Sequence, residues 1–247
     1  MCIRDRFKTE GITDLILDLR FNNGGSVELA RYLAASIAGT SHRSDVFMKM
    51  QRSSGADEYI RFGDGDDLNL KSVRIICSEE TASASELIIS GLRGIDFPVK
   101  LFGSRTEGKN VGMEVQEYKY GNKYYEFAPI TFRSFNAKDW GDYADGIDPD
   151  VMLNNQNSNY EDDIDNVFPY AFGDWDNFDF NYPLYWALCD VQGVDPMTGE
   201  PVKRSGRSGM TRSQPDEIIR VPSVPLKRPA GTFGSLIYNK PEVENLY

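Results

Sequence analysis

The sequence predicts an α/β protein built on a largely parallel sheet. Short apolar runs recur along the first half of the chain, and each of the first two is followed by a turn and then by apolar residues at helical spacing. Strands that alternate with helices pair in parallel, because each helix returns the chain to the same end of the sheet. At 247 residues and 40% hydrophobic content, the chain can also bury a sizeable core.

Two strand–turn–helix units carry this prediction. The first has a strand at Asp14–Leu19, a turn at Asn22–Ser26 and a helix at Val27–Ala38. The second has a strand at Val73–Cys77 and, after a short loop, a helix at Ser83–Leu92. Binding sites of such sheets lie at the carboxyl ends of the strands, which is where the glycine turn and the serine-rich helix start fall.

A third strand, Val99–Phe102, leads into the glycine-bounded segment Gly103–Gly108. Beyond Lys109 the pattern changes to period two, at Met113–Tyr120 and again at Tyr124–Arg133, with a glycine–asparagine turn between them. This pattern predicts a β-hairpin that begins just after the lysine.

The remaining chain divides into segments of different composition. Residues 1–6 are interpreted as foreign to the natural protein, and residues 7–153 as the core of the predicted fold. Residues 154–192 form an acidic and aromatic appendage with a helix at Pro183–Asp190, and residues 193–247 form an extended, partly disordered tail.

Composition narrows the functional classes. A net charge of −11 argues against nucleic acid as the main partner, because phosphate binding needs clustered Lys and Arg. Cys2, Cys77 and Cys189 are too widely separated for a disulfide framework or a zinc site. We therefore expect no metal and no cofactor. No window is long and apolar enough for a transmembrane segment, and the N-terminus is not a signal sequence.

The stretch Thr81–Glu86 offers a nucleophile, and Lys109 offers a base. The one histidine, His42, lies in a polar stretch that indicates a loop. A lysine can take the proton of a serine hydroxyl if its amine is neutral. We therefore identify Ser83 and Lys109 as a candidate Ser/Lys dyad.

An oxyanion site accompanies this dyad. Ser83 begins a helix, so the backbone N–H of Ala84 points outward at the positive end of the helix dipole. Gly24 or Gly25 could supply a second N–H. The structural alternative is that Ser83 merely caps the helix, with Glu86 completing a capping box.

The combination resembles the tail-specific, or C-terminal processing, serine peptidases. It consists of Leu17–Gly25, the Thr-Ala-Ser-Ala-Ser-Glu helix start, and Phe102–Lys109, in that order. The resemblance covers about residues 10 to 150 and implies a ClpP/crotonase-like α/β spiral. It also implies that Ser83 is the nucleophile and Lys109 the general base, with the N–H groups of Ala84 and of Gly24 or Gly25 forming the oxyanion hole.

The resemblance brings one departure and several expectations. Many members carry a glutamine four residues after the lysine, where this chain has Met113, and Gln116 nearby is out of register. The resemblance also implies that residues 7–153 are a catalytic core without the family's peptide-binding PDZ module and without the first strands of that core. The acidic, aromatic C-terminal part is similar to that of Bacteroidetes-type members, which are often envelope lipoproteins, so the resemblance implies the periplasm or outer envelope.

Three hypotheses follow from these residues. The first is a serine endopeptidase that cleaves a polypeptide bound as an extended strand, through an acyl-enzyme. The second is a catalytically inactive peptide- or ligand-binding module on the same fold. The third, with least support, is an envelope protein that uses the aromatic stretch Phe168–Trp186 to bind glycans.

Overall fold

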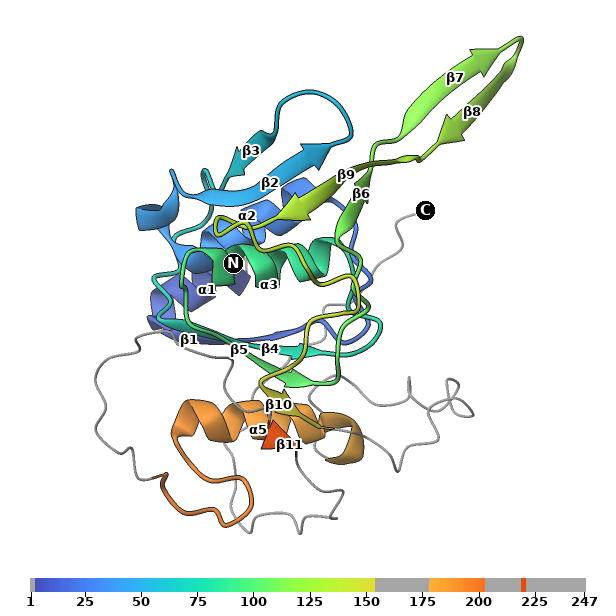
Figure 1. Ribbon diagram of the computed structural model, residues 1–247. Coiled ribbons are helices and arrows are strands. Elements are labelled where there is room, and N and C mark those ends of the chain that lie inside the picture. The colour runs from blue at the N-terminus through green and yellow to red at the C-terminus, as the bar shows by residue number, and fades with distance from the viewer. Residues whose placement is uncertain (1–2, 154–177, 203–218, 221–247) are drawn as a thin grey trace.

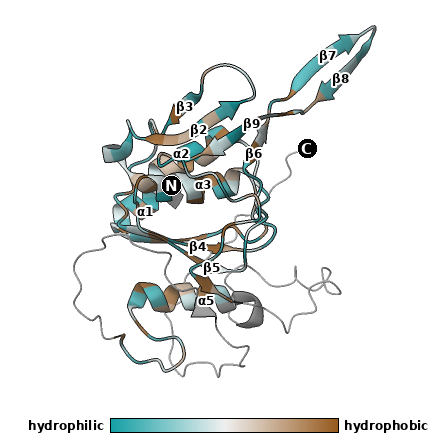
Figure 2. Ribbon diagram, viewed as in Figure 1, coloured by the Kyte–Doolittle hydropathy of each residue, from teal (hydrophilic) through white to brown (hydrophobic). Residues whose placement is uncertain are grey.

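The computed structural model describes residues 3–153, 178–202 and 219–220. Four layers are stacked in it (Figure 1): an antiparallel sheet, a pair of helices, a parallel sheet and one further helix. Figure 2 shows hydrophobic residues concentrated on the central strands of the parallel sheet and on the helix faces that meet it. The interior therefore lies on both faces of the parallel sheet, as in other α/β proteins.

The parallel sheet has the strand order β1-β4-β5-β10-β11, and every neighbouring pair in it is parallel. Its strands are β1 (Asp14–Asp18), β4 (Ser72–Cys77), β5 (Val99–Gly103), β10 (Val151–Met152) and β11 (Ile219–Arg220). The predicted strands at 14–19, 73–77 and 99–102 are confirmed to within one residue at each end. Because β1, β4 and β5 are parallel neighbours, the loops that follow them emerge at one edge.

The two central helices lie between the sheets. They are α2 (Val27–Ala38) and α3 (Ala84–Gly94). α2 begins where predicted because the Ser26 side chain accepts the Leu29 N–H at 3.3 Å, and it ends at Gly39, which has a positive φ of 82°. α3 is buried on nearly all sides, since it contacts both sheets.

The antiparallel sheet covers the outer side of these helices in the order β3-β2-β9-β6. Its strands are β2 (Val46–Arg52), β3 (Glu58–Arg61), β9 (Ile130–Phe135) and β6 (Val111–Met113). Two further strands, β7 (Gln116–Tyr120) and β8 (Lys123–Phe127), form a separate two-stranded sheet that stands out from the body (Figure 1).

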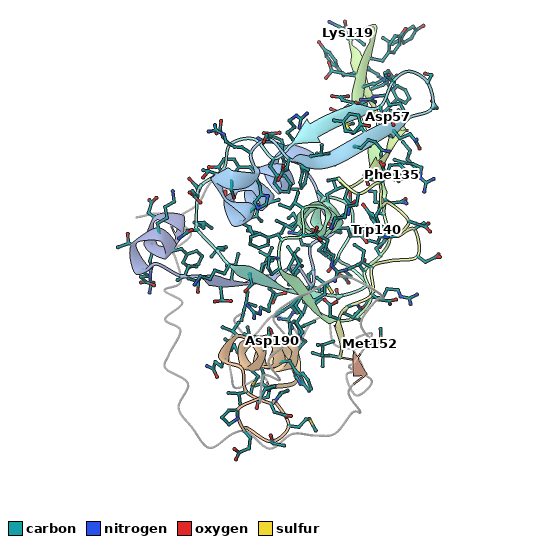
Figure 3. The ribbon with its side chains drawn as sticks, turned by 60° about the vertical axis from the view of Figure 1, so that its left-hand side comes forward. Asp57, Lys119, Phe135, Trp140, Met152 and Asp190 are labelled. Atoms are coloured by element: carbon teal, nitrogen blue, oxygen red, sulfur yellow. The ribbon has the colours of Figure 1, made fainter. Side chains whose placement is uncertain are left out.

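The opposite face of the parallel sheet is covered by α5 (Phe178–Gln192). Tyr185 and Trp186 pack there with Phe102. Asp190, on the side of α5 that faces the sheet (Figure 3), accepts hydrogen bonds from Arg74 at 2.9 Å and from Lys100. Burial pushes the pKa of Asp190 up, but the bonds from these two cations more than offset this and hold it below its usual value.

Several expectations need correction or extension. Four elements were not predicted from the sequence: α1 (Ile3–Glu10), β2, β3 and the 3-10 helix η1 (Thr40–His42). The single predicted hairpin is divided, because each of its long strands breaks into two. The predicted helix at Pro183–Asp190 lies inside the longer α5. The acidic loop within 154–177 lies outside the described residues.

Candidate active site

Three loops meet at the carboxyl edge of the parallel sheet. Gly24 and Gly25 follow β1, Ser83 follows β4, and Lys109 follows β5. Since these strands are adjacent and parallel, the order of the elements alone brings the three loops together. Every residue that the sequence nominated for catalysis therefore lies on one side of the molecule.

Ser83 has a backbone conformation that few non-glycine residues adopt. Its φ is 56° and its ψ is −117°. Such a conformation costs on the order of 1–3 kcal/mol and is found mainly where the surrounding structure enforces it. It is held here by two bonds of the new helix turn, from Ser85 N to Ala82 O (3.1 Å) and from Leu87 N to Ser83 O (2.9 Å). The N–H of Ala84 has no acceptor within the described part of the chain.

The glycine loop packs directly against the serine. A Cβ atom added to Gly24 would lie 2.8 Å from Ser83 Cβ and 2.9 Å from Ala84 N, so only glycine fits there. The Ala82 N–H also donates to Asn22 O at 3.3 Å. The N–H of Gly24 is used by the Asn22 side chain (3.1 Å), whereas that of Gly25 bonds to no described residue. Gly25 and Ala84 therefore have backbone N–H groups available for a ligand.

A buried carboxylate connects the serine to the lysine. Glu86 has no exposed surface, and its Oε2 atom accepts the backbone N–H groups of both Ser83 (2.8 Å) and Lys109 (2.9 Å). The two nitrogens can therefore lie no farther apart than the sum of these two distances. Its Oε1 atom accepts the Gly108 N–H at 2.8 Å and the Thr106 hydroxyl at 2.6 Å. Four hydrogen bonds thus satisfy both oxygen atoms of this buried side chain, as burial of a polar group requires.

The capping interpretation of Glu86 is thus confirmed only as part of a larger role. Glu86 does accept the N–H of Ser83, as in a capping box, but its other three donors come from the segment after β5. This role was not predicted from the sequence, because a capping box with Ser83 was enough to explain Glu86. The available signal was a glutamate directly before the apolar run Leu87–Ile89, in a helix start otherwise made of small residues.

Two threonines complete the framework. Thr81 donates its hydroxyl to Leu19 O at 2.7 Å, and its own carbonyl accepts the Glu107 N–H at 3.1 Å, so it joins all three loops. Thr106 accepts the N–H of Ile147 at 2.8 Å, which fixes the segment around Ile147 against the lysine segment. Neither threonine was nominated from the sequence. Both are buried, and their hydroxyls bond within the protein: that of Thr81 to backbone, and that of Thr106 to backbone and to the Glu86 side chain.

Lys109 is half-buried, and its amine makes no hydrogen bond or ion pair within the described residues. Gly108 beside it has a φ of 98° and packs against the backbone of Ala144, which leaves no room for a side chain there. Met113, four residues on, is 45% exposed at the end of β6, and Gln116 lies in β7, beyond the body of the sheet. The position four residues after Lys109 therefore holds an exposed thioether and not an amide.

Other candidate nucleophiles and bases are remote or inert. His42 lies beyond the opposite end of α2 from the glycine loop, where its Nδ1 is 2.7 Å from Asp45. Burial raises the pKa of the Cys77 thiol to about 12, so this group stays protonated. Cys77 and Cys189 are both free and buried, and Cys2 lies outside the described residues.

In the part of the chain that the structure describes, no group of three or more acidic, histidine or cysteine side chains could hold a metal ion. Among the same residues no helix is both long and apolar enough to span a membrane.

Comparison with known proteins adds a family and a fold. The sequence model of peptidase family S41 matches residues 3–153. A probable CtpA-like serine protease of Staphylococcus haemolyticus is 26% identical over 147 residues, which are 58% of this chain and 28% of the relative. A protein of the same description from Staphylococcus aureus is 27% identical over 170 residues, 68% of this chain and 32% of its own. The chain thus spans about a third of the length of these relatives.

Two solved structures share the architecture. A putative S41 protease from Bacteroides fragilis superposes with a TM-score of 0.62 at 24% identity, over 77% of this chain and 48% of that one. The photosystem II D1 C-terminal processing protease superposes with a TM-score of 0.50 at 23% identity, over 62% and 38%. The expected ClpP-like α/β fold is confirmed by these superpositions and by the parallel sheet.

Proposed function

The chain belongs to peptidase family S41, and on that premise we propose that it carries the Ser/Lys centre of a serine endopeptidase. In this proposal Ser83 is the nucleophile and Lys109 the general base. The N–H groups of Ala84 and Gly25 form the oxyanion hole, with Gly24 as the spacer that allows their approach. The supporting observation is the buried Glu86 carboxylate, whose single Oε2 atom accepts the backbone N–H groups of both Ser83 and Lys109.

The chemistry runs in two halves. The neutral Lys109 amine takes the Ser83 hydroxyl proton as Oγ bonds to the peptide carbonyl carbon, and the resulting oxyanion is stabilised by the two N–H groups. The lysine ammonium then gives its proton to the leaving amine as the C–N bond breaks. In the second half a water, deprotonated by the same amine, attacks the ester and frees the serine. No cofactor is needed for this sequence of steps.

The substrate in this proposal is a polypeptide bound as an extended strand. β6 begins two residues after Lys109 and is the last strand of the antiparallel sheet. A free strand edge can add an extended peptide through main-chain hydrogen bonds, which would carry the scissile bond toward the lysine loop. Following the family resemblance, we also propose envelope proteins as substrates. Detection of the protein only in the cytosolic fraction of cells would contradict that location.

Covalent labelling tests the nucleophile. We expect a serine-reactive fluorophosphonate to add one mass increment to the purified chain, and expect Ser83→Ala to remove it, as measured by intact mass spectrometry. Ser85→Ala, two residues along the same buried helix start, is the matched control and should label as the unmodified chain does. Labelling of Ser83→Ala at the unmodified rate would refute the assignment of Ser83.

Lysine substitution tests the base. Lys109→Met keeps the length of the side chain but removes the amine, and it should slow labelling by about 100-fold or more, the range in which general bases contribute. Lys71→Met, at an exposed position, should have no effect. An unchanged rate in Lys109→Met would remove the lysine from the mechanism.

A binding module remains the second candidate, and one observation favours it. The Lys109 amine has no described partner, and exposed Met113 stands where many relatives place an orienting amide. The binding module would be supported if isothermal titration calorimetry showed that the folded chain binds extended peptides while the fluorophosphonate does not label Ser83. Labelling that depends on both Ser83 and Lys109 would exclude it.

A further inference from the structure

The β7–β8 hairpin, which we call the arm, is an exposed structure that the proposed chemistry does not use. It projects from the body in Figure 1, and Lys119 marks it in Figure 3. All ten residues of its two strands are exposed, and no third strand pairs with it among the described residues. A hairpin of two strands is only marginally stable in water, and its unpaired edges favour addition of another strand.

The two faces of the arm differ in character. Residues directly opposite each other share a face, so Tyr118 and Tyr125 lie together on an aromatic face. On the other face Glu117 lies opposite Glu126, and Lys119 lies over the ring of Tyr124 at 5.2 Å. Like charges directly opposite each other destabilise a strand pair, and neither glutamate has an ion-pair partner in the part of the chain described.

The outer edge of β7 is defined by its register. Tyr120 pairs with Lys123 across the two-residue turn, so this pair exchanges both of its backbone hydrogen bonds. Hydrogen-bonded and non-hydrogen-bonded pairs alternate along an antiparallel ladder. The backbone groups of Glu117 and Lys119 are consequently directed away from β8 and available to another strand.

We propose that this edge pairs antiparallel with β7 of a second copy of the chain, about a two-fold axis at Tyr118. Outward-directed residues must face one another in such a pair. An axis at Glu117 would place glutamate against glutamate, and an axis at Lys119 would place lysine against lysine. Only the axis at Tyr118 places Glu117 of each copy opposite Lys119 of the other, twice, so charge complementarity selects this register.

The pairing also offsets two features that destabilise the isolated arm, its unpaired strand edge and the two glutamates that lie opposite each other. It makes a four-stranded sheet in which Lys119 of one copy lies beside the Glu117 and Glu126 pair of the other. On the opposite face, Tyr118 and Tyr125 of both copies form one continuous aromatic row. The outer edge of β8 presents Tyr124 and Glu126 instead, and it offers no such complementarity. An interface this small is of the weak, reversible class.

Charge reversal tests the pairing in the full chain. Sedimentation equilibrium up to about 500 µM should show a monomer–dimer equilibrium in the micromolar range, as weak interfaces give. Glu117→Lys and Lys119→Glu should each weaken the dimer about tenfold or more, because each creates two like-charge contacts. A one-to-one mixture of the two variants should dimerise again, because both contacts become acidic against basic. Lys123→Glu, on the aromatic face, is the control and should dimerise normally.

Each outcome decides the matter. A chain that stays monomeric throughout the concentration range overturns the proposal, as do single variants that dimerise as tightly as the unmodified chain. A mixture that associates no better than its components also overturns it, provided that both variants keep the circular dichroism spectrum of the unmodified chain. Recovery in the mixture cannot be produced by unfolding of either variant. Together with the weakening of each single variant, it supports the contact between Glu117 and Lys119 that the axis at Tyr118 creates.

Discussion

Replacement of Glu86 by alanine should lower the free energy of unfolding by more than about 4 kcal/mol. The substitution removes the acceptor from four donors: the N–H groups of Ser83, Gly108 and Lys109, and the hydroxyl of Thr106. Each buried donor left without an acceptor costs about 1–3 kcal/mol, so even the low end of that range sums to this value. The relief of a buried charge offsets part of the loss, and a cavity adds to it.

Glutamine at the same position should cost less. The amide keeps the shape of the side chain but has one acceptor atom rather than two. If the NH₂ group replaces Oε1, the Thr106 hydroxyl can rotate and accept a hydrogen bond from it. The Gly108 N–H, however, then has no acceptor. We therefore expect Glu86→Gln to cost about 1–3 kcal/mol, between the unmodified chain and Glu86→Ala.

Urea unfolding followed by circular dichroism measures both values. Glu107→Gln is the matched control, because Glu107 lies in the same segment with an exposed side chain, and it should leave the unfolding midpoint unchanged. If the free energy of unfolding of Glu86→Ala lies within about 1 kcal/mol of that of the unmodified chain, the four hydrogen bonds do not hold the loops of Ser83 and Lys109 together.

Three more predictions follow from the geometry. Gly24→Ala should abolish fluorophosphonate labelling, because its Cβ would meet Ser83 at 2.8 Å, whereas Gly25→Ala, with no atom within 4 Å, should retain part of it; equal labelling of the two variants would contradict this. Asp190→Asn should lower stability by about 1–2 kcal/mol near pH 7. Because the folded pKa of Asp190 is depressed, the stability it contributes is present above its unfolded pKa of about 3.9 and is lost as the pH falls further, so the two unfolding curves should converge in acid. Cys77, with its pKa raised to about 12, should resist Ellman's reagent at pH 9 until the chain is unfolded, and rapid native reaction would show that it is not buried.

The strand–turn–helix core was predictable because its signals are local. Ser26 accepts the Leu29 N–H and Gly39 ends the helix, so α2 has the predicted bounds. The strands β1, β4 and β5 are apolar runs bounded by turns, which sequence patterns identify well. Their parallel order then followed from the intervening helices and placed Ser83, Lys109 and the glycine loop at one edge.

The antiparallel layer was not predictable in the same way. β2 is interrupted by Lys49 and Gln51, and its two partners are far apart in the chain: β3 lies before β4, and β9 lies after β5. The predicted long hairpin breaks near Pro129, because proline has no N–H to donate to a ladder. Such pairings depend on distant segments, which a local pattern cannot reveal.

The role of Glu86 shows the same limit at the site. Three of its four donors lie 20 to 23 residues away in the chain, in the segment from Thr106 to Lys109. The sequence offered a sufficient local partner, Ser83, and so gave no reason to look for others. The proposed nucleophile and base were readable from the motif, but the glutamate that joins their backbones was not.

The packing of α5 determines where the chain can be truncated for expression without exposing its interior. The match to the family's sequence model ends at Leu153, but the folded unit does not, because Tyr185 and Trp186 of α5 complete the cluster formed by Phe102 and Val151. A recombinant chain that ended at residue 153 would lack α5. The apolar face of the parallel sheet that α5 covers would then be exposed to solvent. The C-terminal helix has thus become part of the stable domain, and an expression boundary is better placed beyond it.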